Sequence, residues 1–344
     1  MKNHLFSNLY IYIKLEYINH ERNQQMEKCK KRKKIVLIGT GFVGMSFAYS
    51  LLVSGGIDEL ILIDVNEEKA IGEAMDLQHG LPYAKHKMQI KAGNYAECKD
   101  ADIVVITAGA TQKPGETRID LTVTDTKIVK SVVTNVMQNG FDGILVIACN
   151  PVDIMTYVAQ KVSGLPANRV IGSGTLLDTA RLRFMLSEKL HISTNNVHAY
   201  IMAEHGDTSF VPWSHAYIGS KKLLDIAKDK NISFEELDEI YTQVRQAGYE
   251  IVNRKKSTYY GIGLSLNRLV HAILNDEEVI LTVSCLQNNE YGYKGVYNGV
   301  PAIITRNGIQ EILVLDLTES EKSKFNYSCQ TLQQIIDDVV EPLL

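Results

Sequence analysis

The chain has 344 residues, of which 45% are hydrophobic and 22% are charged, and its formal net charge is −4. These values are typical of a globular protein with one large or two medium domains. The negative balance argues against nucleic acid or an anionic membrane surface as the main partner. No apolar run approaches the ~20 residues that span a bilayer. We therefore expect a soluble protein with neither a nucleic-acid nor a membrane partner.

The five cysteines are scattered, with neither C-x-x-C nor paired Cys/His spacing. Isolated cysteines in a chain of this length are typical of reduced thiols. They favour a cytoplasmic location and predict no metal site.

Residues 1–33 are expected to form a basic extension. The first 34 residues hold nine Lys or Arg against three Glu. A secretory signal needs an apolar stretch of roughly 7–15 residues, and here Lys14 and Glu16 interrupt the apolar run. Two explanations stay open: an arm that packs on a neighbouring subunit, or a start assigned upstream of a true one at Met26.

From residue 34 onward, apolar runs alternate with helical patterns. The runs fall at 34–39, 59–64, 88–92, 102–108, 143–150 and 169–172, and the helical patterns at 43–53, 67–79, 123–138, 152–163 and 176–190. Strands that are apolar throughout and alternate with helices indicate a parallel sheet covered on both faces. The sequence predicts an α/β fold, with a Rossmann-type doubly wound six-stranded parallel sheet in a domain over residues 34–173.

The remaining residues, 174–344, change character. Strand patterns fall near 196–203, 279–287 and 300–305, and long helical patterns at 234–254, 259–274 and 319–340. Runs of strands and helices without strict alternation favour a second domain of α+β type.

Residues 35–38 break into G-x-G-x-x-G at Gly39, Gly41 and Gly44, and Asp64 follows twenty positions later. Such glycines allow a tight turn, a close approach to a pyrophosphate and the packing of a helix on a strand. A carboxylate at Asp64 accepts hydrogen bonds from a ribose diol but repels a 2′-phosphate. Glycine-rich turns also serve backbone geometry alone, but the flanking strand, helix and acid favour NAD.

Polar residues then follow several predicted strands, where the carboxyl ends of a parallel sheet bind ligands. The Pro- and Gly-containing segment 108–118 has the length of a lid, and its Arg118 could polarise a carbonyl oxygen or could simply be solvated. Asn150 could bind a hydroxyl group or cap the next helix.

Two further segments contain an acid, two arginines and a histidine. Asp178 and Arg181 share a helix face, as a surface ion pair or as groups that point into a cleft. Arg183 lies about 140° around that helix from Asp178 and must serve elsewhere. His205, followed by Gly and Asp, suits proton transfer but could be a structural histidine.

Together these groups compose one reaction beside a nicotinamide. Oxidation of a 2-hydroxy acid needs a base (His205), a carboxylate that orients it (Asp178) and an arginine for the substrate carboxylate (Arg181). In the reverse direction, a lid cation (Arg118) would polarise the carbonyl.

The chain from residue 34 onward resembles the lactate/malate dehydrogenase family, in its bacterial NAD-dependent L-lactate dehydrogenase branch. The matching motifs are G-T-G-F-V-G, M-D-L-Q-H, A-G-A-T-Q-K-P-G-E-T-R, N-P-V-D, G-T-x-L-D-T-A-R, E-H-G-D and T-Y-Y-G-I. The resemblance implies a two-domain subunit, normally tetrameric, that interconverts pyruvate and lactate in fermentation.

The same resemblance implies site residues by position. His205 matches the proton donor and acceptor, Asp178 its partner, Arg181 the carboxylate clamp and Arg118 the lid arginine. It places the remaining substrate residues at Gln112, Asn150 and Thr258, and the NAD-binding residues at Gly39, Gly41, Phe42, Val43, Gly44, Asp64, Lys69, Ala108, Gly109 and Asn150.

The resemblance also implies that substrate choice depends on Gln112. The malate enzymes of the family are expected to have an arginine at this position. A glutamine leaves the second carboxylate of oxaloacetate unpaired in a closed site, at several kcal/mol, whereas pyruvate meets no such penalty. Malate and 2-hydroxyisocaproate dehydrogenases stay as alternatives, because an apolar pocket discriminates each methylene by only ~1–3 kcal/mol. A catalytically silent NAD-binding protein is a further alternative from another class.

Two positions bear on regulation, and one departs from the family pattern. Arg183 and His198 match positions that bind fructose 1,6-bisphosphate across a subunit interface in allosteric members, or they make interface hydrogen bonds only. Ala203 replaces the usual glycine before E-H-G-D, which strains the backbone if that site needs a positive φ.

Overall fold

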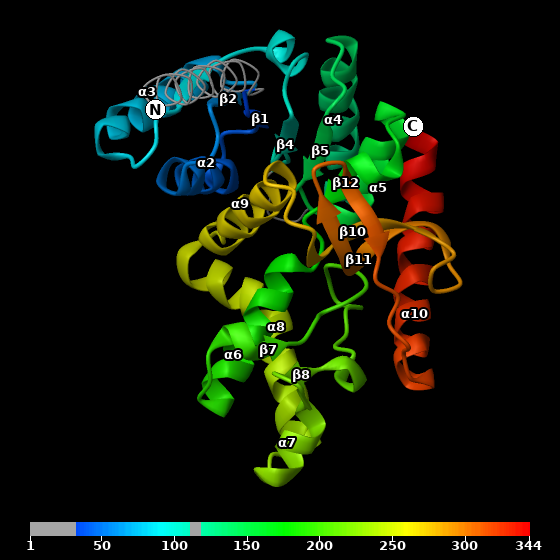
Figure 1. Ribbon diagram of the computed structural model, residues 1–344. Helices are drawn as coiled ribbons and strands as arrows, with labels where there is room; N and C mark the ends of the chain where they lie inside the picture. Colours follow the sequence, from blue (N-terminus) through cyan, green and yellow to red (C-terminus); the bar gives the residue numbers. More distant parts are fainter. Residues whose placement is uncertain (1–31, 111–117) are drawn as a thin grey trace, which may run out of the picture. The chain divides into compact units, whose positions relative to one another are not determined.

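The computed structural model describes residues 32–110 and 118–344, with the side chain of Arg118 left out of the description. Residues 34–344 form one compact unit. Within the described residues, a nine-stranded sheet runs in the order β12-β11-β10-β6-β5-β4-β1-β2-β3 (Figure 1).

Six strands of this sheet are parallel, as the sequence predicts. They are β1 (Lys34–Ile38), β2 (Glu59–Ile63), β3 (Gln89–Ala92), β4 (Ile103–Ile106), β5 (Ile144–Ile147) and β6 (Val170–Gly172). Every residue of β1, β2, β4 and β5 is buried. This burial explains the continuous apolar runs, since helices cover both faces of a parallel sheet.

The crossover helices of this half also follow the predicted alternation. They are α2 (Phe42–Ser54), α3 (Glu67–Gly80), α4 (Arg118–Gln138) and α5 (Val152–Ser163). α4 begins at Arg118, five residues before the predicted start at 123, and most of the predicted lid segment lies outside the described residues. α4 lies against α5 (Figure 1).

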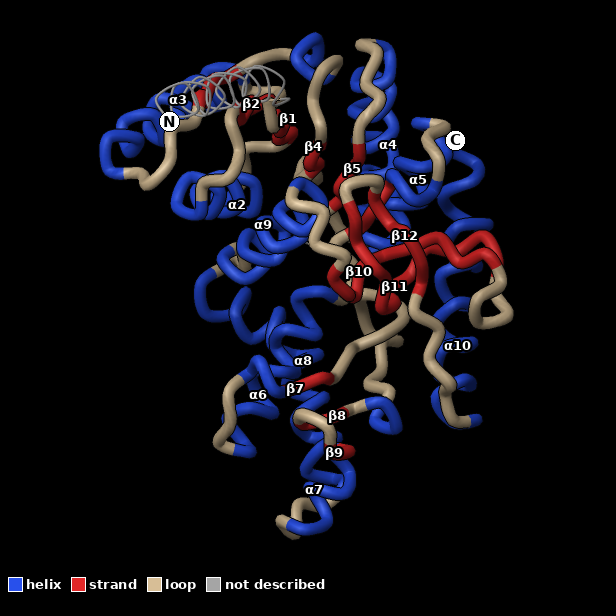
Figure 2. Tube along the Cα trace, in the orientation of Figure 1, coloured by secondary structure: helices blue, strands red, loops and turns tan. Residues whose placement is uncertain are grey.

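Three antiparallel strands continue the same sheet. They are β10 (Val279–Asn288), β11 (Lys294–Thr305) and β12 (Gly308–Ile312). They lie together in Figure 2. β10 joins β6 through the single pair Ser284 and Gly172. A Cβ at Gly172 would lie 2.6 Å from the Cβ of Ser284, so the glycine permits this junction. The predicted strands of the second half thus extend the parallel sheet instead of forming a separate one.

The other helices of the second half are α6 (Leu176–Leu190), α7 (Leu223–Asp229), α8 (Phe234–Lys255), α9 (Tyr260–Leu274) and α10 (Glu319–Ile335), the last followed by a π-helical turn at Ile336–Val340. α8 and α10 each begin with a complete capping box, from Ser233 with Glu236 and from Thr318 with Glu321. Such caps satisfy backbone N–H groups that a helix leaves without partners, which fixes where both helices begin.

A short sheet is built from β7 (Val197–His198), β8 (Tyr217–Ile218) and β9 (Lys221–Lys222). The predicted strand over 196–203 is therefore mostly wrong, because only two of its residues lie in β7. Its end forms isolated bridges instead, in which Met202 pairs with Phe210 and Ala203 with Gly299. A second hydrophobic cluster, which includes Leu182, Trp213 and Val244, packs α6, α7 and α8 around this sheet.

None of the helices within residues 32–110 and 118–344 is long and apolar enough to cross a membrane.

Candidate active site

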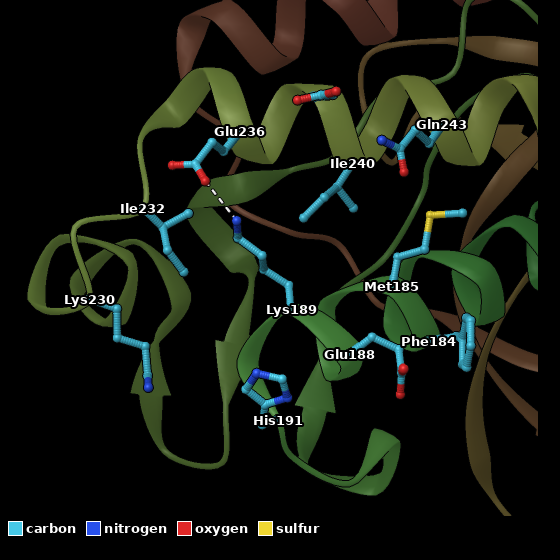
Figure 3. A pocket seen from close by; sticks show the side chains of 11 residues that line it. Phe184, Met185, Glu188, Lys189, His191, Lys230, Ile232, Glu236, Ile240 and Gln243 are labelled. Atoms are coloured by element: carbon cyan, nitrogen blue, oxygen red, sulfur yellow. Dashed lines mark hydrogen bonds and ion pairs between the residues drawn. The ribbon is translucent and has the colours of Figure 1, made fainter.

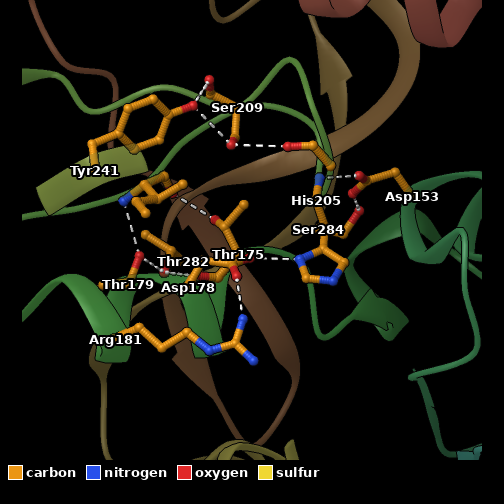
Figure 4. A network of polar contacts seen from close by, with 12 residues as sticks. Asp153, Thr175, Asp178, Thr179, Arg181, His205, Ser209, Tyr241, Thr282 and Ser284 are labelled. Carbon is orange, nitrogen blue, oxygen red and sulfur yellow. Dashed lines mark hydrogen bonds and ion pairs between the residues drawn. The ribbon is translucent and has the colours of Figure 1, made fainter. Parts of the chain in front are cut away.

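His205 and Asp178 lie within hydrogen-bond distance of each other (Figure 4). Asp178 lies in the first turn of α6, which begins four residues after β6 ends. Its Oδ2 is 2.5 Å from Nδ1 of His205. Because the bond uses Nδ1, the other ring nitrogen, Nε2, is left to face a substrate. The His205 side chain keeps 28% of its surface exposed, so the imidazole is accessible.

The electrostatics of this pair favour a charged imidazole. The Asp178 carboxylate raises the pKa of His205 to about 9, against the opposing effect of burial. Burial alone would raise the pKa of Asp178, but the charges and hydrogen bonds of His205 and Arg181 outweigh it and lower that pKa. Asp178 therefore stays ionised and holds a proton on its partner, which is the state that a general acid needs.

Arg181 contacts the same carboxylate from the next turn of α6. Its guanidinium donates to Oδ1 of Asp178 at 3.0 Å, and the two side chains are only 16% and 13% exposed. The solvated surface ion pair that the sequence left open is therefore not what the structure contains. A guanidinium has five N–H donors, so one bond to Asp178 leaves donors for a substrate carboxylate.

Threonine side chains fix the start of α6 behind this cluster (Figure 4). Thr175 donates to the carbonyl of Ile201 at 2.6 Å, and the backbone N–H of Ile201 donates to Thr179 Oγ1 at 2.9 Å. Thr282 on β10 adds a 2.9 Å bond to Thr179. These buried bonds tie α6 to the chain that leads to His205, so Asp178 and His205 keep a fixed separation.

The glycine-rich turn has the shape that a dinucleotide needs. Gly39 has φ +103°, and a Cβ there would lie 2.7 Å from the backbone N of Ala108. A Cβ at Gly44 would lie 2.0 Å from the carbonyl oxygen of Gly39, so the third glycine allows the helix to pack. At Gly41, the residue before α2, a Cβ would meet nothing within 4 Å. The protein thus leaves open space where a phosphate group would approach the helix start.

Asp64 lies at the end of β2 beside that turn. Its Oδ2 accepts hydrogen bonds from the backbone N–H of Thr40 at 2.7 Å and from the Thr40 hydroxyl at 2.8 Å. Burial would raise the pKa of Asp64, but hydrogen bonds from the backbone of Asn66 and from Thr40 outweigh it and lower that pKa. An ionised carboxylate in this place suits a ribose diol and disfavours a 2′-phosphate, so the residues present fit NAD.

The remaining predicted cofactor residues border the same turn. Phe42 is 71% exposed in the first position of α2, and Val43 follows it. Lys69 contributes to the low pKa of Asp64. Ala108 and Gly109 follow β4, where the backbone N of Ala108 is in reach of the Gly39 turn.

The structure describes only some of the other predicted substrate residues. Asn150 is exposed after β5, and it does not cap α5, whose N-cap position is Pro151 without a side-chain cap. Thr258 is half-buried in the loop between α8 and α9. Gln112 lies outside the described residues. Arg118 begins α4, but its side chain also lies outside the description.

The predicted regulatory residues are close in the fold. Arg183 on α6 donates to the carbonyl oxygen of Ala199 at 3.1 Å and lies over the ring of Tyr200. His198 is the neighbour of Ala199 and is exposed at the end of β7.

Sequence reasoning assigned no role to two residues of the site, Asp153 and Ser284. The Asp153 carboxylate accepts a hydrogen bond from the backbone N–H of His205 at 2.8 Å and another from the Ser284 hydroxyl at 2.6 Å. Asp153 belongs to the N-P-V-D motif, but Ser284 is 131 residues away in the chain. No local pattern could bring the two together.

A surface hollow lies between α6 and α8, lined by residues that include Lys189, His191, Lys230 and Glu236 (Figure 3). The ion pair of Lys189 and Glu236 crosses it. It shares no residue with the His205 cluster.

The sheet, the glycine turn and the His205 cluster together define an NAD-dependent 2-hydroxy-acid dehydrogenase. The family models agree: residues 33–172 match the NAD-binding domain of lactate/malate dehydrogenases, and residues 175–342 match their alpha/beta C-terminal domain. The chain belongs to the lactate/malate dehydrogenase family and, within it, to the NAD-dependent L-lactate dehydrogenases.

Individual relatives support this assignment. L-lactate dehydrogenase 2 of Bacillus cereus is 53% identical over 308 residues, which cover 89% of this chain and 98% of that protein. A lactate dehydrogenase from a Medee basin deep-sea metagenome has a crystal structure that is similar at a TM-score of 0.88 and 52% identity, covering 90% of this chain and 99% of that one. The ligand-bound minor L-lactate dehydrogenase of Enterococcus mundtii has the same TM-score at 47% identity, with 90% and 99% covered.

Proposed function

We propose that this chain interconverts (S)-lactate and pyruvate through the groups around His205. When bound, NAD supplies the carbon that accepts or returns the hydride. The observation that carries the proposal is the partly buried chain of Arg181, Asp178 and His205, in which one carboxylate contacts both a guanidinium and an imidazole.

Each polar group has a part in this reaction. His205 takes the hydroxyl proton of lactate and returns it to pyruvate, while ionised Asp178 orients the ring and stabilises the imidazolium. Arg181 binds the substrate carboxylate through its remaining donors. Asn150 and Thr258 border the substrate, and Arg118 polarises the carbonyl oxygen from the start of α4.

Gln112 sets the choice of substrate. A neutral amide there leaves the second carboxylate of oxaloacetate without a cationic partner, which favours pyruvate over oxaloacetate. Assays with pyruvate, oxaloacetate and 4-methyl-2-oxopentanoate separate the lactate, malate and 2-hydroxyisocaproate activities.

The test of the proton role is His205→Asn. The variant should bind NADH normally, because the glycine turn lies on another part of the sheet, but its pyruvate turnover should fall at least ~100-fold. Measurements of NADH fluorescence and steady-state pyruvate reduction give both quantities. The matched control is His191→Asn, at an exposed histidine after α6, which should turn over normally. Near-normal turnover of the His205 variant would reject this assignment.

We also propose a tetrameric enzyme of the cytoplasm that fructose 1,6-bisphosphate activates. Tyr49 and Val53 on α2, and Tyr260 and Leu264 on α9, are more than half exposed, and Gly263 of α9 lies against α2. Such apolar side chains suit a surface covered by a second subunit. The four described cysteines are free thiols, which supports a reducing compartment.

Arg183 and His198 are the proposed effector residues. They lie on neighbouring segments, and Arg183 faces away from the catalytic helix face. Two such pairs across a dyad would place guanidinium and imidazole groups around a bisphosphate.

A further inference from the structure

A second carboxylate holds His205, from the side opposite Asp178. Asp153 lies in the first turn of α5 and is 2% exposed. Both of its oxygens are used, since Oδ2 accepts the backbone N–H of His205 at 2.8 Å and Oδ1 accepts the Ser284 hydroxyl at 2.6 Å (Figure 4). His205 is thus bound through its ring by α6 and through its backbone by α5.

The position of Asp153 is decided by the junction of the sheet. Ser284 on β10 is paired with Gly172 at the end of β6, the only strand pair that joins β10 to the described parallel strands. α5 begins directly after β5, which lies beside β6. Asp153 therefore links the parallel strands, the antiparallel strands and the segment that carries His205.

The charge of this carboxylate also reaches the imidazole. Burial raises the pKa of Asp153 to about 7, although the hydrogen bonds from Ser284 and from the His205 backbone oppose that rise. Above that pH the group is anionic, and its charge raises the pKa of His205, as that of Asp178 does more strongly.

The other charged or titratable groups around this pair are few in the described part of the chain. Arg181 on α6 lowers the pKa of His205, and Glu204 of the neighbouring segment raises that of Asp153. Tyr241 of α8 interacts with Asp178. The buried thiols of Cys285 on β10 and Cys329 on α10 both interact with Asp153.

We propose that Asp153 is a positioning residue for the reaction: it fixes the backbone of His205 against the sheet and supplies a second negative charge that keeps the imidazole protonated. This inference rests on the proposed proton role of His205. It implies that the two functions of the carboxyl can be separated by substitution.

Asp153→Asn tests the charge alone. An asparagine can accept from the His205 N–H and donate to the Ser284 oxygen, so both bonds persist while the charge is lost. The alkaline limb of kcat/KM for pyruvate reduction should then move to lower pH by about half a unit. Asp153→Ala removes both bonds, and its kcat should fall roughly 10- to 100-fold through misplacement of the imidazole.

Ser284→Ala is a second variant that keeps most of the structure. It removes one bond that stabilises the ionised carboxyl, so the limb should move in the same direction as in Asp153→Asn but less. The matched control is Asp142→Asn, at an 84% exposed carboxylate before β5 that pairs with Arg169. That control should leave both kcat and the limb unchanged.

The outcomes are distinct. In one outcome, His205→Asn loses turnover while Asp153→Asn and Ser284→Ala keep the wild-type alkaline limb of kcat/KM. The charge role of Asp153 is then wrong, and the proposed function stands. If Asp153→Ala keeps its kcat, the positioning role is wrong. If the variants have lower thermal stability but the same alkaline limb of kcat/KM as the wild type, Asp153 is a structural residue only.

Discussion

His205, the residue that we propose as the proton carrier, has three charged neighbours that lie on two helices. Asp178 and Arg181 share α6, which the helical spacing predicted, and Asp153 comes from α5. The spacing alone allowed a solvated ion pair on α6. The structure excludes a solvated pair, because the two side chains are mostly removed from water. The electrostatic effect of such a pair on the neighbouring imidazole is stronger than it would be in water.

The raised pKa of His205 predicts a pH dependence with a definite sign. Pyruvate reduction needs the protonated imidazole, so kcat/KM should be flat at neutral pH and fall as the pH rises through about 9. Lactate oxidation needs the neutral ring and should rise over the same range. Initial rates in both directions between pH 6 and 10 measure this.

Asp178→Asn provides the comparison, because it removes the largest cause of the raised pKa. In Asp178→Asn, the alkaline limb of kcat/KM for pyruvate reduction should lie at lower pH than in the wild type. A wild-type limb near the ordinary pKa of histidine, unchanged in this variant, would contradict the electrostatic account.

At the scale of elements, the turn from β1 into α2 contains glycines of two kinds. Two are required by the fold, and we propose that the third makes room for the cofactor. Gly39 and Gly44 are required by the fold itself, since a Cβ at either would overlap the backbone. Gly41 has φ −73°, and nothing of the protein lies where its Cβ would be. The motif predicted all three positions, but only the folded structure separates the two glycines that the backbone requires from Gly41.

Gly41→Ala should therefore fold normally and lose cofactor. The free energy of unfolding should change by no more than about 1 kcal/mol, whereas the Kd for NADH should rise at least roughly tenfold, because a methyl group fills the space near the pyrophosphate. Chemical denaturation and NADH fluorescence titration measure the two quantities.

Gly72→Ala in α3 is the matched control, since its Cβ would also meet nothing within 4 Å but lies far from the turn in sequence. It should bind NADH normally and gain about 0.5–1 kcal/mol in stability from better helix propensity. Equal NADH affinity of the two variants would remove the proposed role of Gly41.

At the scale of the whole molecule, the described chain leaves apolar side chains of α2 and α9 uncovered and places Arg183 beside the segment of His198. Ala203 shows how distant parts determine a local conformation. Its φ is +76°, so the strain that the sequence allowed for is present, and hydrogen bonds at 2.8 Å to and from Gly299 hold it there. An alanine tolerates this conformation at a cost of about 1–2 kcal/mol.

The effector prediction belongs to this scale because it needs two subunits. Fructose 1,6-bisphosphate should lower the pyruvate concentration for half-maximal rate at pH 6, and less so at pH 7.5. Arg183→Gln should abolish the response while it leaves the maximal rate intact. Saturation curves, with sedimentation of the same samples to confirm a tetramer, test this, and an unchanged pyruvate response at both pH values would refute it.

The parallel half of the sheet, its helices, the glycine turn and the acid at Asp64 could be predicted from the sequence, because each is encoded by residues within one strand–helix unit. The residue types that we propose for the reaction could be read from the sequence as well. How these residues meet depends on contacts that only the folded chain makes. The junction of β10 with β6, the short β7 and the hold of Asp153 on His205 all depend on contacts between residues far apart in the chain, and no local periodicity records such contacts.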